Sequence, residues 1–469
     1  MKIFLKKSKA LILVLSMMVG LLSGIPTMIM ADTSANIYVK ADYSGGDSDG
    51  SQDKPYTSLS DAFSNVSADT TIHLLSDIEI SSYIEYAKTY NVTIDGTGIN
   101  GANYTIRPTN NSTDPRLFNI TNVSTVTYAN VTLDGYSADK SAQAQYLVTS
   151  LKGSLTFNSG TVIQNFNLYT YRGGGGASII TDYYGTLTIN EGVVIRDNTV
   201  NTSGQASYQS NPSAVIIVGS GGTLKLNGGL ITNNKCTEAS TGIISLGTGI
   251  KAYIGNVEIS NNTLYYDTQG LTSSGDYGSY ALQKRMASAT TPKESYYYFS
   301  GQCIVDNNYA YDENGKAYER NVYTPKGAVV YLNGKLEDGA SIGVSLDEAP
   351  SVKLPVAVGT QATTYTKLGI TGVNVYDATS DDAKYFSIDN ITNAKIGYDD
   401  SDTSDKKIVI AQKLYKVCFN SNGGSGNMKD QSFTVGGSAT ALSKNTFTRE
   451  GYIFEGWSTS KTGNVEYVD

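Results

Sequence analysis

The chain has 469 residues, of which only 17% are charged, and its formal net charge is −8. This acidic balance argues against nucleic acid or an anionic lipid surface as the main partner, because both repel a negative protein. Gly (48) and Tyr (35) are abundant while Pro (9) is scarce, which indicates an all-β protein with a polar, uncharged surface rather than a disordered tract.

Residues 1–31 have the pattern of a secretion signal peptide. Four lysines precede an apolar run over residues 10–22, and Ala31 and Ala35 are candidate cleavage points. The run is short for a transmembrane helix, although a retained membrane anchor is the alternative. We expect the signal to be removed, which changes the net charge from −8 to −12 and leaves no membrane-inserted segment. The lysine-rich start is typical of a Gram-positive bacterium.

The next segment, residues 36–66, predicts an extended strand, a loop rich in Gly, Asp and Ser, and a short serine-capped helix. Hard oxygen ligands cluster in the loop, so Asp42, Asp47 and Asp49 are candidate Ca²⁺ ligands. A solvated Asp/Gly turn explains the same residues, because no Glu follows at the closing position of an EF-hand loop.

One phrase recurs between Gly153 and Asn308. Each copy is a short strand, a Gly/Asn turn, a second short strand and an Asn-rich corner. The spacing between copies is irregular, which is typical of stacked solenoid coils joined by loops of variable length. Strands this short are stable only when each pairs with its equivalent in the neighbouring coils. The best copies are Gly153-Ser-Leu-Thr-Phe-Asn-Ser-Gly-Thr-Val-Ile-Gln-Asn165, Gly185-Thr-Leu-Thr-Ile-Asn-Glu-Gly-Val-Val-Ile-Arg-Asp-Asn198 and Gly222-Thr-Leu-Lys-Leu-Asn-Gly-Gly-Leu-Ile-Thr-Asn-Asn234.

The corner asparagines are expected to stack their amides from coil to coil, as identical residues do in stacked sheets. They are Asn165, Asn198, Asn234, Asn262 and Asn308. Near-copies of the strand occur earlier, so the solenoid is expected to cover residues 36–346. These near-copies are Asn91-Val-Thr-Ile-Asp-Gly96 and Asn130-Val-Thr-Leu-Asp-Gly135.

The opening strand, the loop, the Pro55-Tyr56 pair and the helix resemble the N-terminal entry of parallel β-helix proteins of the pectin-lyase-like superfamily. The resemblance implies a right-handed parallel β-helix solenoid whose helix shields the open edge of the first coil. Many β-helix proteins are polysaccharide lyases or glycoside hydrolases, and these activities are therefore the alternative to a role without catalysis.

Candidate catalytic residues are few. Asp95 and Asp134 occupy matching positions in the two near-copies and could supply the carboxylate pair of a glycosidase, although Asp-Gly turns explain them equally well. Arg172 is a candidate lyase base, but no Asp-rich phrase accompanies it. The one histidine, His73, lies in an apolar strand, which disfavours a Ser/His/Asp triad or a His-based metal centre. No cofactor is expected beyond the Ca²⁺ considered above.

Tyrosines gather around the interruptions of the phrase. Their rings could stack on sugars from an exposed β surface, although each is also explained as a strand former. The candidate ligand-binding residues are Tyr169, Tyr171, Tyr183, Tyr184 and Tyr297.

Three cysteines rule out a complete disulfide framework in an exported protein. A bridge between Cys236 and Cys303 would form only if their coils are neighbours, and buried thiols are the alternative.

Residues 347–413 are interpreted as final coils, a C-terminal cap and a polar linker, and residues 414–469 as a separate module. Its phrases closely resemble the Listeria–Bacteroides repeat, or internalin B B-repeat, which implies a small β-grasp-like module. Trp457 is expected in its core with Phe454 and Tyr452 around it, in preference to a ligand role. The family's closing phrase is absent, so we expect an incomplete module or further repeats in a longer parent protein. The phrases are Tyr415-Lys-Val-Cys-Phe-Asn-Ser-Asn-Gly-Gly424, Arg449-Glu-Gly-Tyr452 and Phe454-Glu-Gly-Trp457.

These features predict a secreted bacterial cell-envelope or surface protein that serves adhesion or carbohydrate or host-surface binding without catalysis. The expected partners are cell-wall or host glycans or surface proteins. A β-helix polysaccharide lyase or glycoside hydrolase is the alternative.

Overall fold

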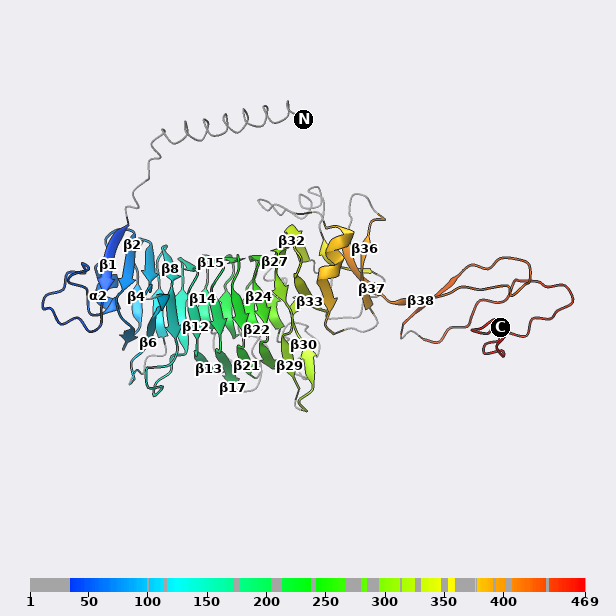
Figure 1. The fold of residues 1–469 in the computed structure, drawn as a ribbon, viewed down its shortest axis with the longest axis horizontal. Helices are drawn as coiled ribbons and strands as arrows, with labels where there is room; N and C mark the ends of the chain where they lie inside the picture. The colour runs from blue at the N-terminus through cyan, green and yellow to red at the C-terminus, as the bar shows by residue number, and fades with distance from the viewer. Residues whose placement is uncertain are drawn as a thin grey trace, which may run out of the picture.

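Short parallel strands wound into a solenoid make up most of the molecule, and a smaller strand-containing segment follows it (Figure 1). This arrangement confirms the predicted all-β parallel β-helix. The computed structural model describes residues 34–98, 101–110, 112, 116–171, 178–203, 213–237, 242–265, 280–284, 295–312, 314–324, 330–346, 353–358, 376, 378–390, 394–401, 407–435 and 438–468.

The first sheet has 13 strands and contributes one strand from every coil. Its strands are parallel as far as β34, and β37 and β36 then add antiparallel pairs. In order across the sheet they are β1 (Ala35–Val39), β2 (Thr70–Leu74), β5 (Val92–Asp95), β8 (Thr125–Ala129), β11 (Ser154–Phe157), β15 (Thr186–Ile189), β19 (Thr223–Leu226), β23 (Lys251–Gly255), β27 (Tyr296–Gly301), β32 (Val330–Leu336), β34 (Lys353–Val358), β37 (Lys407–Gln412) and β36 (Ala394–Asp399).

The second sheet has 18 strands in two parallel series that meet at β33. One series is β3 (Ile78–Ile80), β6 (Tyr104–Pro108), β9 (Val131–Asp134), β12 (Val162–Gln164), β16 (Val194–Arg196), β20 (Leu230–Thr232), β24 (Glu258–Ser260), β28 (Ile304–Val305) and β33 (Ser341–Leu346). The other is β4 (Ile84–Tyr86), β7 (Arg116–Ile120), β10 (Tyr146–Ser150), β14 (Ser178–Asp182), β18 (Ala214–Val218), β22 (Gly242–Leu246), β26 (Tyr280–Lys284) and β31 (Val322–Thr324), and β35 (Phe386–Ile388) pairs with β33.

The third sheet has six strands and lies along the lower edge of the solenoid in Figure 1. An antiparallel hairpin between its last two strands ends it. The strands are β13 (Asn167–Tyr171), β17 (Thr199–Ser203), β21 (Lys235–Thr237), β25 (Thr263–Tyr265), β29 (Tyr309–Tyr311) and β30 (Ala317–Glu319).

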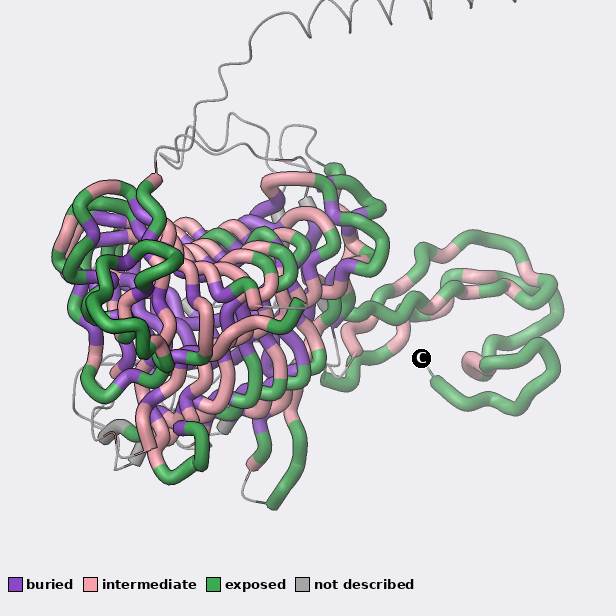
Figure 2. Tube along the Cα trace, turned by 60° about the vertical axis from the view of Figure 1, so that its left-hand side comes forward, coloured by how far each residue is buried: buried purple, intermediate pink, exposed green. Residues whose placement is uncertain are grey.

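Buried and partly exposed residues alternate along most strands of the first sheet, whereas β14, β18 and β22 of the second sheet are buried throughout. In β11 and β15 every second residue is buried and the residues between are partly exposed. The buried residues form a continuous apolar column inside the coils (Figure 2). Aromatic rings stack within it, as Tyr128 and Phe157 do with centroids 5.2 Å apart. Side chains at equivalent positions of neighbouring coils therefore pack against each other in the interior.

The helix α2 (Leu59–Ser64) covers the beginning of the solenoid, as predicted. Ser58 caps it by accepting a hydrogen bond from the backbone N–H of Asp61 at 3.1 Å. Phe63, on its buried face, lies 5.2 Å from the ring of Tyr86 in the first coil. The helix thus closes an end that would otherwise expose apolar side chains.

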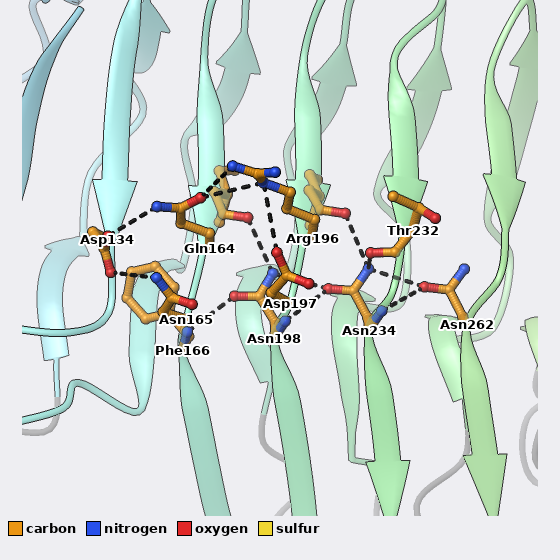
Figure 3. Close-up of polar contacts among 12 residues, drawn as sticks. Asp134, Gln164, Asn165, Phe166, Arg196, Asp197, Asn198, Thr232, Asn234 and Asn262 are labelled. Atoms are coloured by element: carbon orange, nitrogen blue, oxygen red, sulfur yellow. Dashed lines mark hydrogen bonds and ion pairs between the residues drawn. The ribbon is translucent and has the colours of Figure 1, made fainter.

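A buried ladder of asparagines holds the corner between the second and third sheets, as predicted. The Oδ1 of Asn234 accepts the backbone N–H of Asn198 at 3.2 Å and its side-chain amide at 2.9 Å. Asn262 accepts the same two groups of Asn234, both at 3.0 Å (Figure 3). The Nδ2 of Asn234 also donates to the carbonyl of Ile195 at 3.0 Å. One side chain therefore satisfies buried donors and acceptors from two coils.

The two ends of the ladder differ from the prediction. In the coil before that of Asn198, Phe166 occupies the ladder position. Asn165 is instead the turn residue before it, with φ 64°. At the far end the ladder extends beyond Asn308 to Asn321, whose backbone N–H and amide donate to Asp389 at 3.0 and 3.1 Å. The residue before each inner ladder asparagine has φ between 54° and 57°, a region that Asn and Asp tolerate; these are Asp197, Asn233, Asn261 and Asn307.

The two near-copies around Asp95 and Asp134 are not equivalent in the fold. Val92 pairs with Val126 in the first sheet, whereas Val131 pairs with Tyr104 in the second. The same short sequence suits either sheet because both need a strand with one buried face followed by a turn.

Beyond the last complete coil, the described part of residues 347–413 contains β34–β37 and the 3₁₀ helix η2 (Ser380–Tyr385). The following segment pairs β38 (Leu414–Val417) with β39 (Gln431–Thr434) in antiparallel fashion.

Trp457 lies in an aromatic cluster of this C-terminal segment. Its ring is 4.7 Å from Phe419, 4.8 Å from Phe454 and 6.3 Å from Phe447. The expectation that Tyr452 also surrounds it is wrong: Tyr452 is 65% exposed and lies under the guanidinium of Arg449 instead. None of the described residues between 414 and 468 is buried, so this cluster is the segment's main apolar contact.

We expect Asn234→Ala to lower the free energy of unfolding by about 3 kcal/mol, because it removes the acceptor of two buried N–H groups of Asn198 and the donor to Ile195. Denaturant unfolding followed by circular dichroism measures the change. Asn227→Ala is the matched control, since Asn227 donates to Asn190 on the exposed surface. Equal losses in the two variants would contradict the role of the ladder.

Because Trp457 is the chain's one tryptophan, its fluorescence reports on the C-terminal segment alone. We expect that signal to change at a lower denaturant concentration than the far-UV circular dichroism of the solenoid. The reason is the small buried apolar area of the segment. Coincident transitions would contradict this expectation.

Candidate functional site

The outer surface of the first sheet carries hydroxyl side chains in register on consecutive coils. The central row consists of Thr71, Thr93, Thr127, Thr156 and Thr188, each paired with the next across the sheet. A second row, two residues earlier along the strands, consists of Thr125, Ser154, Thr186 and Thr223. We call these two rows the threonine face.

The strand alternation creates this face. Between the outward hydroxyl residues lie Val126, Leu155 and Leu187, all fully buried, so the two rows project from the opposite side of the sheet. Every member of the threonine face is partly exposed. A β-branched side chain has restricted χ1 rotation, so methyl and hydroxyl groups hold defined positions on the sheet.

The hydroxyls of the central row have no hydrogen-bond partner within the described residues. The neighbouring amide row behaves differently. Asn190 donates to Asn158 at 2.7 Å, and Asn227 donates to Asn190 at 2.8 Å. The amides therefore satisfy one another along the solenoid, while the central hydroxyls keep their hydrogen-bonding capacity for solvent or a ligand.

At the N-terminal end of the face, His73 and Asp95 lie side by side. His73 Nδ1 is 3.5 Å from Asp95 Oδ2, and its Nε2 is 2.9 Å from Asn36 Oδ1. Burial acts to raise the pKa of Asp95, but hydrogen bonds from Thr97 and Asn130 outweigh it and the pKa lies below its ordinary value. Asp95 therefore acts as an ionised acceptor that organises the Thr97 turn.

At the other end, the central row changes to Lys225 and then to tyrosines. The rings of Tyr253, Tyr298 and Tyr331 stack with centroid distances of 5.3 and 5.6 Å. Lys225 is exposed and has no ion pair within the described part of the chain. The second row likewise passes from Thr223 to Lys251, so the uncharged part of the face ends at two lysines, and the aromatic stack follows Lys225.

Asp134, the second carboxylate candidate, belongs to a different surface. Its oxygens accept hydrogen bonds from Gln164 and Asn165, both at 2.9 Å, and from the backbone of Tyr136. Gln164 in turn accepts from Arg196 at 3.0 and 3.2 Å, which extends the network over three coils (Figure 3). Because Asp95 lies in the first sheet and Asp134 in the second, the expected equivalence of the two carboxylates does not hold.

The tyrosine candidates are scattered over different parts of the molecule. Tyr169 on β13 is 63% exposed and Tyr184 after β14 is 69% exposed; Tyr183 is half-buried, with its ring 6.4 Å from that of Tyr184. The prediction for Tyr297 is wrong, because it points into the solenoid and is fully buried beside Phe299. The side chains of two further candidates, Tyr171 and Arg172, lie outside the described residues.

The structure does not assemble the candidate Ca²⁺ ligands. Asp42 lies 3.8 Å from Lys40, and Asp49 accepts the backbone N–H of Ser51. The ligand hypothesis also included Asp47, but in the described ranges no three His, Cys, Asp or Glu side chains come together as a metal site.

The cysteines follow the alternative to a disulfide, which is that the thiols are buried and unbridged. Cys236 on β21 and Cys303, between β27 and β28, are both buried and lie two coils apart, and no disulfide joins them. Burial raises the pKa of Cys303 to about 12, which keeps it an unreactive thiol.

One buried carboxylate stands out from the apolar interior. Asp182 at the end of β14 has no exposed surface, and its Oδ1 accepts the backbone N–H of Gly185 at 2.8 Å. Its Oδ2 has no hydrogen-bond partner among the described residues. Burial raises the pKa of Asp182 to about 7, because the hydrogen bonds only partly offset the loss of solvation. Its position inside the coil gives it a structural role in the turn.

The threonine face was not predicted from the sequence, although the sequence contains a signal for it. Thr125-Val-Thr127, Ser154-Leu-Thr156 and Thr186-Leu-Thr188 place hydroxyl residues two apart in successive copies. The alignment of these residues in rows requires the register between coils, which spacing along the chain does not reveal.

Comparison with known proteins identifies the C-terminal segment. Residues 415–469 match the Listeria-Bacteroides repeat domain, which confirms the predicted repeat module and suggests a bacterial surface protein. Searches of the curated proteins and of the solved structures gave no match. Within the described residues, no helix has the length and hydropathy needed to span a membrane.

Asp182 predicts an unusual pH dependence of stability. Its folded pKa of about 7 lies above the ordinary 3.8, so the folded state binds the proton more tightly than the unfolded state. Stability should therefore fall by about 4 kcal/mol as pH rises from 4 to 7 and should then level off. Asp182→Asn, which retains the acceptor for Gly185, should remove this contribution and be more stable than the wild type at pH 7.5. Identical pH profiles for the two proteins would contradict the assignment.

Proposed function

We propose that this chain is part of a secreted bacterial surface protein that binds glycans through the threonine face without catalysis. The Listeria-Bacteroides repeat supports the location, and the proposed secretion rests on the signal-like residues 1–31. Cell-wall or host glycans are the proposed partners. The acidic chain makes nucleic acid an unfavourable partner.

The observation that carries the proposal is the row of unpartnered hydroxyls at Thr71, Thr93, Thr127, Thr156 and Thr188. Hydroxyl groups both donate and accept hydrogen bonds, as sugar hydroxyls do, and the threonine methyl groups add apolar contact. The row repeats at the spacing of parallel strands, about 4.8 Å. A glycan lying along the solenoid would therefore meet the same contact in each coil.

The absence of catalysis is supported by the hydrogen-bonded state of the carboxylate candidates. Asp95 holds the Thr97 turn, and Asp134 binds Gln164 and Asn165. A general acid in a glycosidase needs a raised pKa and a partner carboxylate across the scissile bond. Asp95 instead has a lowered pKa, and Asp134 lies on another sheet.

Replacing two central threonines tests the binding site. Thr127→Val with Thr156→Val keeps the branched shape but removes both hydroxyls, so we expect glycan affinity to fall about tenfold. A glycan array that identifies a ligand for the wild-type chain, followed by titration calorimetry, measures the change. Thr132→Val on the outer surface of the second sheet is the matched control and should bind like the wild type.

Two results would contradict the proposal. Unchanged binding by the double variant would show that the threonine face is not the site. New reducing ends or ultraviolet-absorbing unsaturated products from pectins, uronates or glycosaminoglycans would show that the protein is a hydrolase or a lyase instead.

A further inference from the structure

The charge and regularity of the threonine face indicate which class of glycan it binds. We propose that it binds the ordered surface of an insoluble, uncharged polysaccharide, of the cellulose or chitin class, rather than a single soluble chain. The inference rests on the proposed glycan-binding function and specifies the class of glycan.

The threonine face is uncharged over most of its length. Both rows are uncharged from Thr93 and Thr125 to Thr188 and Thr223, and the adjacent amide row of Asn158, Asn190 and Asn227 is also neutral. The charges that flank the rows lie at the two ends, on Asp95 at one end and on Lys225 and Lys251 at the other. A polyanion laid along the rows would lose its hydration without gaining a matching charge in each coil, whereas an uncharged polysaccharide has no such penalty.

The threonine face is also regular in two dimensions. Along the solenoid the hydroxyl residues recur about every 4.8 Å, and across each strand the two rows are separated by about 6.7 Å, or two residues. The positions are held by the parallel register of β8, β11 and β15 and by the buried residues behind them. The register thus holds the hydroxyl residues in a regular array, and the strands of the first sheet lie side by side along the solenoid in Figure 1.

A regular array of ordered side chains favours a partner that is itself ordered. A flexible soluble glycan must give up conformational freedom on a surface that encloses none of its faces, which weakens binding. Chains in a crystalline fibre are already ordered, so many weak hydroxyl contacts add without that loss. The threonine side chains are also ordered before binding because of their β-branching.

The test compares physical forms of the same polymer. The full chain is mixed with microcrystalline cellulose, crystalline chitin, acid-swollen amorphous preparations of both, and soluble cello- and chito-oligosaccharides. Depletion isotherms give the affinities. We expect at least one crystalline polymer to bind at least tenfold more tightly than its amorphous form, with weaker binding still to the oligosaccharides.

Variants test whether binding to the crystalline polymer depends on the threonine face. Thr156→Arg introduces bulk and charge into the plane and should lower affinity for the crystalline polymer at least tenfold, while Thr132→Arg on the second sheet should not. Circular dichroism of the Thr156→Arg variant checks that any loss does not come from misfolding, and Thr156→Val, which removes one hydroxyl but keeps the strand-favouring shape, should lower the affinity less. Thr127→Ser retains the hydroxyl but frees its rotation, and should give an intermediate affinity.

The outcomes separate this inference from the proposed function. Equal or tighter binding to soluble or amorphous chains would overturn the preference for an ordered surface but leave glycan binding in place. Preference for charged glycans would overturn the partner class. Failure to bind any glycan in any form would remove the proposed function as well.

Discussion

The buried asparagine ladder is the interaction on which the rest of the solenoid depends. At the corner between the second and third sheets the chain turns sharply, and its peptide groups cannot all join a sheet. The amide of Asn234 supplies both an acceptor for Asn198 and donors for Ile195 and Asn262, so the corner remains satisfied without water. At its C-terminal end, Asp389 offers only acceptors when ionised, which suits the last donors from Asn321.

A fixed corner also determines the register of the strands that precede and follow it. Once the coils are aligned, alternation along each strand becomes a set of rows along the solenoid. Inward rows form the core, as with Leu155 and Leu187, and outward rows form surfaces such as the threonine face. Threonine is also a good strand former, so its presence alone has a structural explanation. The free hydroxyls of the central row separate this surface from the self-satisfied amides of Asn158, Asn190 and Asn227.

Sequence reasoning succeeded where the physical cause is local. The Gly and Asn turns, the serine-capped helix at Leu59–Ser64 and the phrases of the C-terminal repeat are each specified by neighbouring residues. The stacking of Asn198, Asn234 and Asn262 was also predictable, because each ends a recognisable copy of the phrase. Reasoning from the sequence failed for Tyr297 and for the Asp95 and Asp134 pair, where the outcome depends on which sheet and which side of the sheet a residue occupies.

The sequence by itself determined that the chain would form short strands and turns, that these would stack as a solenoid, and that a repeat module would follow. Those properties come from period-2 alternation and from turn residues that tolerate positive φ. Only the tertiary structure decided which outward residues align. Loops of different lengths separate the copies, so spacing along the chain does not reveal that Thr127, Thr156 and Thr188 are neighbours. That alignment follows from parallel hydrogen bonding between coils, which acts between residues far apart in the sequence.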